Sequence, residues 1–111
     1  MVQYSPNLDL AFAALADPTR RGILERLGAG ECSITDLAET FGMTLTGMKK
    51  HVSILEAARL VTTEKIGRVR ICRLGPRRLD DETAWIGMYQ QMLDARLNRL
   101  GAFLERTKGT L

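Results

Sequence analysis

Apolar residues recur at helical spacing through the first half of the chain, and short polar or glycine-containing stretches interrupt them. After an arm of residues 1–7, this pattern predicts a short helix over residues 8–16. Asp17 and Pro18 then predict the start of a second helix, because Asp is a favoured N-cap and proline is tolerated at the first helical position. The glycines at positions 28 and 30 predict where that helix ends.

Two further helices follow, and a tight turn joins them. Ser33 is the predicted N-cap of the first helix, and Gly42 stands just past its end. Thr44 is the predicted N-cap of the second helix, which runs to about Ala58. Two short helices joined by a glycine-containing turn of about three residues are typical of a helix-turn-helix. We therefore place this motif at residues 33–58.

The pattern changes to alternation after the helix-turn-helix. Residues 61–74 are rich in β-branched and alternating apolar positions, which predicts a β-hairpin with its turn near Gly67. A long helix is predicted over residues 79–106. This order of elements predicts a mainly α protein with a small β-hairpin, a winged helix-turn-helix, as a single domain over residues 8–111.

The last predicted helix carries an apolar stripe that is longer than so small a domain needs for its own core. We expect the stripe to pack against a second copy of the chain, together with the first predicted helix. The alternative is that it covers only the core of the monomer. The expected residues of the dimer interface are Leu8, Phe12, Leu15, Trp85, Met88, Tyr89, Met92, Leu93, Leu97, Leu100 and Phe103.

The composition is that of one globular domain of 111 residues, with 45% hydrophobic and 26% charged residues. The longest apolar run, residues 10–16, is far shorter than the roughly 20 residues of a membrane helix, and no signal peptide is apparent. Cys32 and Cys72 lie far apart in sequence, which is typical of a reduced protein. We expect a cytoplasmic protein that does not contact membranes.

The sequence offers little for catalysis. His51 is the only histidine, so an HExxH metal site is impossible, and no glycine-rich phosphate loop or nucleophile motif is present. We expect neither an enzyme nor a cofactor. We interpret His51 as a partly buried packing residue, with a ligand or sensor role as the alternative.

The charge is concentrated in one part of the chain. Residues 44–78 hold nine basic and two acidic residues, a net charge of +7, whereas the whole chain carries only +3. A basic segment in an otherwise mildly acidic chain is typical of a surface that binds nucleic acid phosphates. The alternative is a solvated basic face.

The helix predicted after Thr44 has two different faces. Met48, Val52 and Leu55 fall on its apolar side, and the opposite side holds two lysines and two hydroxyl side chains. Such a helix fits the major groove of DNA, where lysine donates to guanine and hydroxyls contact bases or phosphates. The hairpin adds further cations, among them Arg73. The expected DNA-contacting residues are Thr44, Leu45, Thr46, Lys49, Lys50, Ser53, Lys65, Arg68 and Arg70.

Two stretches resemble the ArsR/SmtB family of bacterial winged-helix repressors. They are residues 14–24, Ala-Leu-Ala-Asp-Pro-Thr-Arg-Arg-Gly-Ile-Leu, and residues 50–61, Lys-His-Val-Ser-Ile-Leu-Glu-Ala-Ala-Arg-Leu-Val. The resemblance implies a homodimer that binds operator DNA and is released by an effector. It also implies that Thr46, Lys49, Lys50 and Ser53 read DNA and that Arg68 and Arg70 belong to the wing.

The chain departs from the metal-sensing members of that family. Where they carry Cys-x-Cys-Asp-Leu, this sequence has Ser33-Ile34-Thr35-Asp36-Leu37. The last helix has the acids Asp80, Asp81 and Glu82 but no histidine. We therefore expect no metal site of the types known in the family.

These observations predict a homodimeric, sequence-specific transcriptional regulator, a repressor that binds a pseudo-palindromic operator in double-stranded DNA. A small-molecule effector of unknown identity is a further expected partner. Three alternatives stay open: a winged-helix module that binds protein, a thiol switch at Cys32 or Cys72, and a role in RNA binding. Concentrated positive charge argues against the first of these, and the lack of an aromatic platform for stacking bases argues against the third.

Overall fold

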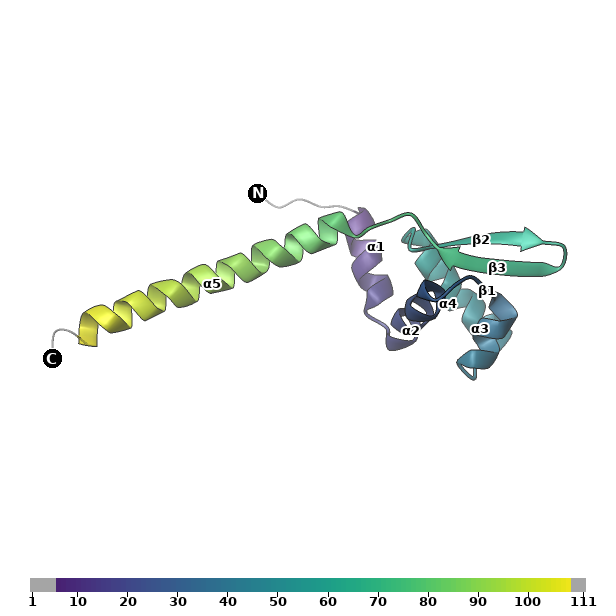
Figure 1. Ribbon diagram of the computed structural model, residues 1–111, viewed down its shortest axis with the longest axis horizontal. Coiled ribbons are helices and arrows are strands. Elements are labelled where there is room, and N and C mark those ends of the chain that lie inside the picture. The colour runs from purple at the N-terminus through teal and green to yellow at the C-terminus, as the bar shows by residue number, and fades with distance from the viewer. Residues whose placement is uncertain (1–5, 109–111) are drawn as a thin grey trace. The chain divides into compact units, whose positions relative to one another are not determined.

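The computed structural model describes residues 6–108 (Figure 1). The chain divides into two compact units, the first ending at Leu79 and the second beginning at Asp80. The elements of the first unit are α1 (Pro6–Leu15), α2 (Pro18–Gly28), β1 (Cys32–Ser33), α3 (Ile34–Thr40), α4 (Leu45–Ala57), β2 (Val61–Ile66) and β3 (Val69–Leu74). The second unit is the helix α5 (Asp80–Lys108).

Side-chain caps start the three central helices where the sequence predicts them. The side chain of Asp17 accepts from the backbone N–H of Arg20 at 3.0 Å, which begins α2. Ser33 and Thr44 cap α3 and α4 in the same way, at 3.0 and 3.1 Å. Gly42 adopts a left-handed φ of +61° just after α3. Each cap satisfies N–H groups that a helix start leaves free. The predicted helix-turn-helix is confirmed, because α3 and α4 both form and a turn containing Gly42 joins them.

The sheet has three strands, whereas the sequence predicts two. β2 and β3 form the predicted antiparallel hairpin, and Gly67, with φ +63°, begins its turn. The short strand β1 pairs antiparallel with β3 on the other side, so the strand order is β1-β3-β2. A strand of two residues is too short to show alternation. Its pairing depends on a partner forty positions away, so the sequence pattern could not predict it.

The core of the first unit lies where α2, α3, α4 and the sheet meet. The largest side chains buried there are Ile23, Leu37, Met48, Leu55, Val61 and Cys72. Met48, Val52 and Leu55 come from the predicted apolar side of α4, and all three are buried. Full burial of such a side chain stabilises a fold by about 1.5–3 kcal/mol, so this packing fixes how α4 is rotated about its own axis.

The end of α4 and the end of the hairpin are held together at two backbone sites. Arg59 adopts a left-handed φ of +64° and lets Leu60 N–H donate to Leu55 C=O at 2.9 Å, which ends the helix. Gly75 N–H then donates to Leu60 C=O at 2.8 Å. A Cβ at position 75 would collide with the carbonyl oxygen of Arg59. The absence of a side chain at Gly75 therefore lets the exit of β3 lie against the exit of α4.

The helix α5 spans 29 residues, in agreement with the predicted long helix, and opens with Asp80, Asp81 and Glu82 in its first turn. Acidic side chains at a helix start are favoured by the partial positive charge of the free N–H groups. Within residues 6–108, no helix is both long and apolar enough to span a bilayer.

We predict that Gly75→Ala lowers the free energy of unfolding by about 1–3 kcal/mol, because the new methyl group meets backbone that cannot move aside easily. Gly28→Ala, at the end of α2 with no atom within 4 Å of the added Cβ, is the matched control. It should leave stability unchanged or raise it by up to about 1 kcal/mol. Urea denaturation of both variants gives the comparison, and equal stabilities would contradict the assignment of Gly75.

Candidate nucleic-acid interface

The exposed side of α4 is polar and basic, as its sequence predicts. Thr46, Lys49, Lys50 and Ser53 are exposed, and the opposite side of the helix is buried in the core. Thr44 is also exposed, but its side-chain oxygen already accepts from Gly47 N–H at 3.1 Å. Its hydroxyl proton can still donate to a phosphate. The structure therefore presents two lysines and two hydroxyl side chains along one side of α4, and the Thr44 hydroxyl at its start.

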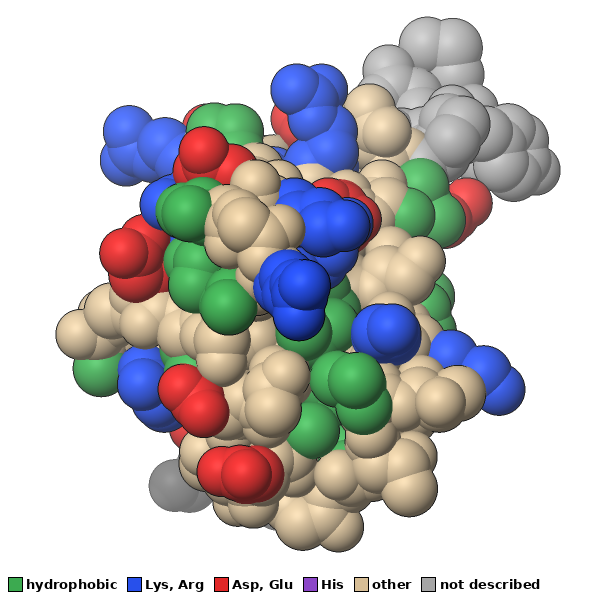
Figure 2. Space-filling view, turned by 90° about the vertical axis from the view of Figure 1, so that its right-hand side faces the viewer, with side chains coloured by type: hydrophobic (Ala, Val, Ile, Leu, Met, Phe, Trp, Pro, Cys, Tyr) green, Lys and Arg blue, Asp and Glu red, His purple; other side chains and the backbone are tan. Residues whose placement is uncertain are grey.

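A basic cleft of about 260 Å³ lies between the start of α4 and the hairpin. Its lining combines four cations with one hydroxyl and two apolar side chains, and none of these described residues is acidic. The lining residues are Ile34, Thr35, Leu45, Lys49, Lys65, Arg68 and Arg70. Figure 2 looks onto the molecule from the side of the β2–β3 turn, and several Lys and Arg side chains project from the middle of this face. The cleft brings together cations from α4 and from the hairpin that are distant in sequence.

Thr35 and Ile54 are candidate contact residues that the sequence reasoning did not select. Thr35 belongs to α3 and reaches the basic cleft only because α3 packs against α4 and β3. Ile54 is 40% exposed and borders a second, open hollow of about 490 Å³ with Thr46, Lys49, Lys50 and Ser53. The place of Ile54 directly after Ser53, at the edge of the polar side of α4, is a weak sequence signal for such a role. Its side chain is suited to contact with a thymine methyl group.

A chain of polar contacts ties the hairpin to α4. Arg70 donates to the Thr63 hydroxyl at 2.9 Å, and this hydroxyl donates to the Glu56 carboxylate at 2.8 Å. Glu56 belongs to α4, Thr63 to β2 and Arg70 to β3. These bonds help to fix the hairpin beside α4, so Arg70 both lines the cleft and supports its shape.

Arg73 has a different environment from the other hairpin cations. Its guanidinium donates to Glu31 at 2.5 Å and to Glu64 at 2.6 Å. These two hydrogen bonds, that of Glu64 first, raise the pKa of Arg73 above its ordinary value. Because two carboxylates offset its charge, Arg73 contributes less to the basic surface than its position in the sequence suggests.

The two cysteines lie opposite each other in the sheet. Cys32 of β1 and Cys72 of β3 are register partners, and both are free and buried. Burial, and secondarily the neighbouring Cys32, raises the pKa of the Cys72 thiol. The thiolate is the reactive form of cysteine, so this environment makes Cys72 less reactive. The sequence pattern did not predict that the two cysteines pair across the sheet. Their burial disfavours the alternative of a thiol switch.

The structure also bears on metal binding and on the residues predicted for a dimer interface. In residues 6–108, no group of three or more His, Cys, Asp or Glu side chains is arranged to hold a metal ion. Leu8, Phe12 and Leu15 of α1 are half-buried. The side chains predicted from α5 are all exposed, and the rings of Trp85 and Tyr89 stack with centroids 5.8 Å apart. Ile86 and Leu104 extend this apolar surface of α5.

Comparison with known proteins agrees with this geometry. Residues 15–64, from the end of α1 into β2, match a family model described as a helix-turn-helix domain. The transcriptional repressor SdpR of Bacillus subtilis is 32% identical over 68% of this chain and 83% of its own length. The crystal structure of an ArsR family transcriptional regulator, RHA00566, is 38% identical and has a TM-score of 0.75. That match covers 85% of this chain and 97% of the other.

A third similar protein is Mb0332 from Mycobacterium bovis, whose solution structure is described as a homodimeric winged helix-turn-helix DNA-binding domain. It is 24% identical and has a TM-score of 0.61, over 89% of this chain and 95% of the other. At that identity the similarity supports the fold.

We predict that Arg68→Gln weakens binding to duplex DNA and reduces the slope of log affinity against log salt by about one, because one phosphate contact is lost. Arg73→Gln removes the same charge and is the matched control. It should leave the salt slope unchanged, because Glu31 and Glu64 already engage Arg73. Fluorescence anisotropy between 50 and 200 mM salt measures both, and equal slopes for the two variants would contradict the distinction.

Proposed function

Because this chain belongs to the ArsR family of winged helix-turn-helix transcriptional regulators, we propose that it is a homodimeric repressor that binds a pseudo-palindromic operator. At a coarser level, the chain is a DNA-binding transcriptional regulator and not an enzyme. The finer proposal adds the dimer, the two-fold operator and the direction of regulation. SdpR is named a repressor and Mb0332 is described as homodimeric, which supports two of these additions.

The observation that carries the proposal is the basic cleft beside the exposed side of α4. In B-DNA, one phosphate backbone separates the major groove from the neighbouring minor groove. With α4 in the major groove and the β2–β3 turn at the minor groove, that backbone passes between them. The cleft lies at this place and is lined by Lys49, Lys65 and Arg68. Cations so placed fix the register of the protein on DNA without reading the sequence.

Base reading is then left to the exposed side of α4. Lys49 and Lys50 can donate to the O6 and N7 atoms of guanine, and the hydroxyls of Thr46 and Ser53 can contact either bases or phosphates. Leu45 is 41% exposed at the start of the helix and can meet a thymine methyl group. A site without acidic side chains and with four cations fits DNA better than it fits a protein partner, because a protein partner does not require such concentrated positive charge.

The first test is selection from a pool of random duplexes, followed by anisotropy with the enriched duplex and a scrambled duplex of equal length. We expect enrichment of an inverted repeat with half-sites about 34 Å apart, and at least a hundredfold preference over the scrambled duplex. Lys49→Ala with Lys50→Ala should reduce affinity for the enriched duplex by about tenfold or more. The melting temperature should not change, because both side chains are exposed. Equal binding to both duplexes would contradict the function, and unchanged affinity in the double variant would contradict the residue assignment.

The second part of the proposal is that the apolar surface of α5 packs against a second copy of the chain. Leu93, Leu97 and Leu100 are 43%, 63% and 52% exposed, and they are spaced four and three residues apart, which puts them on one side of the helix. Exposed apolar surface on this scale is typical of an interface rather than of a monomer. A two-fold dimer supplies a matching surface, because each copy presents the same residues to the other.

We predict that sedimentation equilibrium detects a dimer at micromolar concentration and that Leu97→Glu shifts it toward the monomer. A charge buried in the interface without a partner destabilises the dimer. Affinity for the enriched duplex should fall as well, because two half-sites are no longer bound together. Gln91→Glu adds the same charge at a polar position of α5 and should leave the dimer intact. A wild-type monomer at these concentrations would contradict the proposed dimer.

A further inference from the structure

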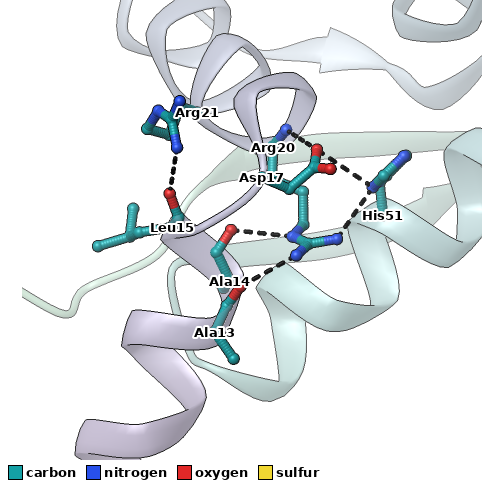
Figure 3. Close-up of polar contacts among 7 residues, drawn as sticks. All are labelled: Ala13, Ala14, Leu15, Asp17, Arg20, Arg21 and His51. Atoms are coloured by element: carbon teal, nitrogen blue, oxygen red, sulfur yellow. Dashed lines mark hydrogen bonds and ion pairs between the residues drawn. The ribbon is translucent and has the colours of Figure 1, made fainter.

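One arginine of α2 contacts both α1 and α4 (Figure 3). The side chain of Arg20, from the first turns of α2, donates through Nε to Ala14 C=O and through a terminal nitrogen to Ala13 C=O, each at 2.9 Å. Both carbonyls belong to the last turn of α1, and that of Ala13 also accepts from Ala16 N–H at 3.3 Å. The other terminal nitrogen of Arg20 lies 3.3 Å from Nδ1 of His51, which belongs to α4. Arg20 therefore joins the end of α1 to the helix that faces DNA.

The chemistry of the contact settles which atoms donate. A guanidinium has only donors, so Nδ1 of His51 accepts, and the ring proton then lies on Nε2. His51 is partly buried, as the sequence interpretation has it, and the structure adds a polar contact. Its side chain is 20% exposed and makes a polar contact on the side of α4 that faces α2.

Asp17 completes this group of residues. Its carboxylate accepts from Arg20 N–H at 3.0 Å and lies 4.0 Å from Nδ1 of His51. The hydrogen bond from Arg20 N–H, and to a smaller extent the charge of the Arg20 guanidinium, lower the pKa of Asp17 below its ordinary value of 3.8. Asp17 thus stays ionised near neutral pH and holds the backbone from which the Arg20 side chain projects.

The contact between Arg20 and His51 is directional, whereas the apolar packing of α4 is not. Met48, Val52 and Leu55 hold α4 against the core through apolar contacts, which are not directional. A planar guanidinium bound to two carbonyls and one ring nitrogen has a fixed geometry, so it resists sliding and tilting of α4 against α1. We propose that Arg20, acting through His51, is a positioning residue that sets the orientation of α4 relative to α1.

The inference concerns the spacing of the two DNA-facing helices, and in that respect it rests on the proposed function. In the dimer expected from the sequence, Leu8, Phe12 and Leu15 of α1 belong to the interface together with α5, and α4 carries the proposed base contacts. A fixed relation between α1 and α4 therefore fixes the distance and rotation between the two copies of α4. A regulator with this constraint discriminates strongly between operators of different half-site spacing.

Arg21 provides a matched control. It is the neighbour of Arg20 on α2, and it also donates to an α1 carbonyl, that of Leu15, at 2.7 Å (Figure 3). Its hydrogen bond does not involve α4. Arg20→Met and Arg21→Met each remove one charge and at least one bond to α1, but only the first removes the bond to His51.

The experiment compares the enriched duplex with the same duplex carrying one base pair inserted between its half-sites. The wild-type protein and Arg21→Met should bind the inserted duplex at least tenfold more weakly than the original. Arg20→Met should bind the original duplex about tenfold more weakly than wild type and should lose most of its preference over the inserted one. His51→Leu should behave like Arg20→Met. His51→Asn places an acceptor near the position of Nδ1 and should restore the preference. Retention of the wild-type preference in both Arg20→Met and His51→Leu would overturn the inference.

A second measurement is independent of DNA. Spin labels on cysteines introduced at Leu10 of α1 and Ser53 of α4, both exposed, report the distance between these helices in protein diluted with unlabelled copies. The distance distribution should broaden in Arg20→Met but not in Arg21→Met. If Arg20→Met does not fold, His51→Leu serves in its place. Unchanged distributions would refute the positioning role. If the wild-type protein prefers no duplex but the distribution still broadens in Arg20→Met, the proposed function alone would be refuted.

Discussion

The burial of one side of α4 is the constraint on which the rest of the interface depends. Met48, Val52 and Leu55 must leave water, and each contributes about 1.5–3 kcal/mol when fully buried. A rotation of α4 by half a turn would expose them and bury two lysines without partners, which is far more costly. The exposure of Lys49 and Lys50 is thus a consequence of apolar packing on the opposite side of the helix. The packing of the apolar side therefore decides which side of α4 stays exposed for the proposed contact with DNA.

The hairpin becomes part of the same surface through backbone contacts. The left-handed residue Arg59 ends α4, and the hydrogen bond from Gly75 to Leu60 returns β3 to that point. The contacts of Thr63 with Glu56 and Arg70 add side-chain support. Because the two ends of the hairpin are fixed near the end of α4, its turn projects beside the start of that helix. The basic cleft is the space between them.

The arginines of this protein have different roles, and the role of each depends on the residues around it. Arg20 joins two helices, Arg68 stands exposed at the hairpin turn, and Arg73 pairs with two carboxylates. Of these three arginines, only Arg68 has its charge fully available to a phosphate. Net charge along the sequence therefore overstates how many cations the surface offers. The distinction between structural and exposed arginines comes from contacts between residues up to 42 positions apart.

The sequence by itself determined the helices, their caps, the hairpin turn and the basic side of α4, because each depends on residues a few positions apart. Asp17, Ser33, Thr44 and Gly67 signal their elements locally, and the periodicity of Met48, Val52 and Leu55 shows which side is buried. Only the tertiary structure decided the third strand, the pairing of Cys32 with Cys72, the place of Thr35 in the cleft and the bond of Arg20 to His51. These features join residues from 31 to 40 positions apart or, for Thr35, depend on how α3 packs. A local pattern carries no information about which distant partner a side chain meets, because packing of the whole core chooses that partner.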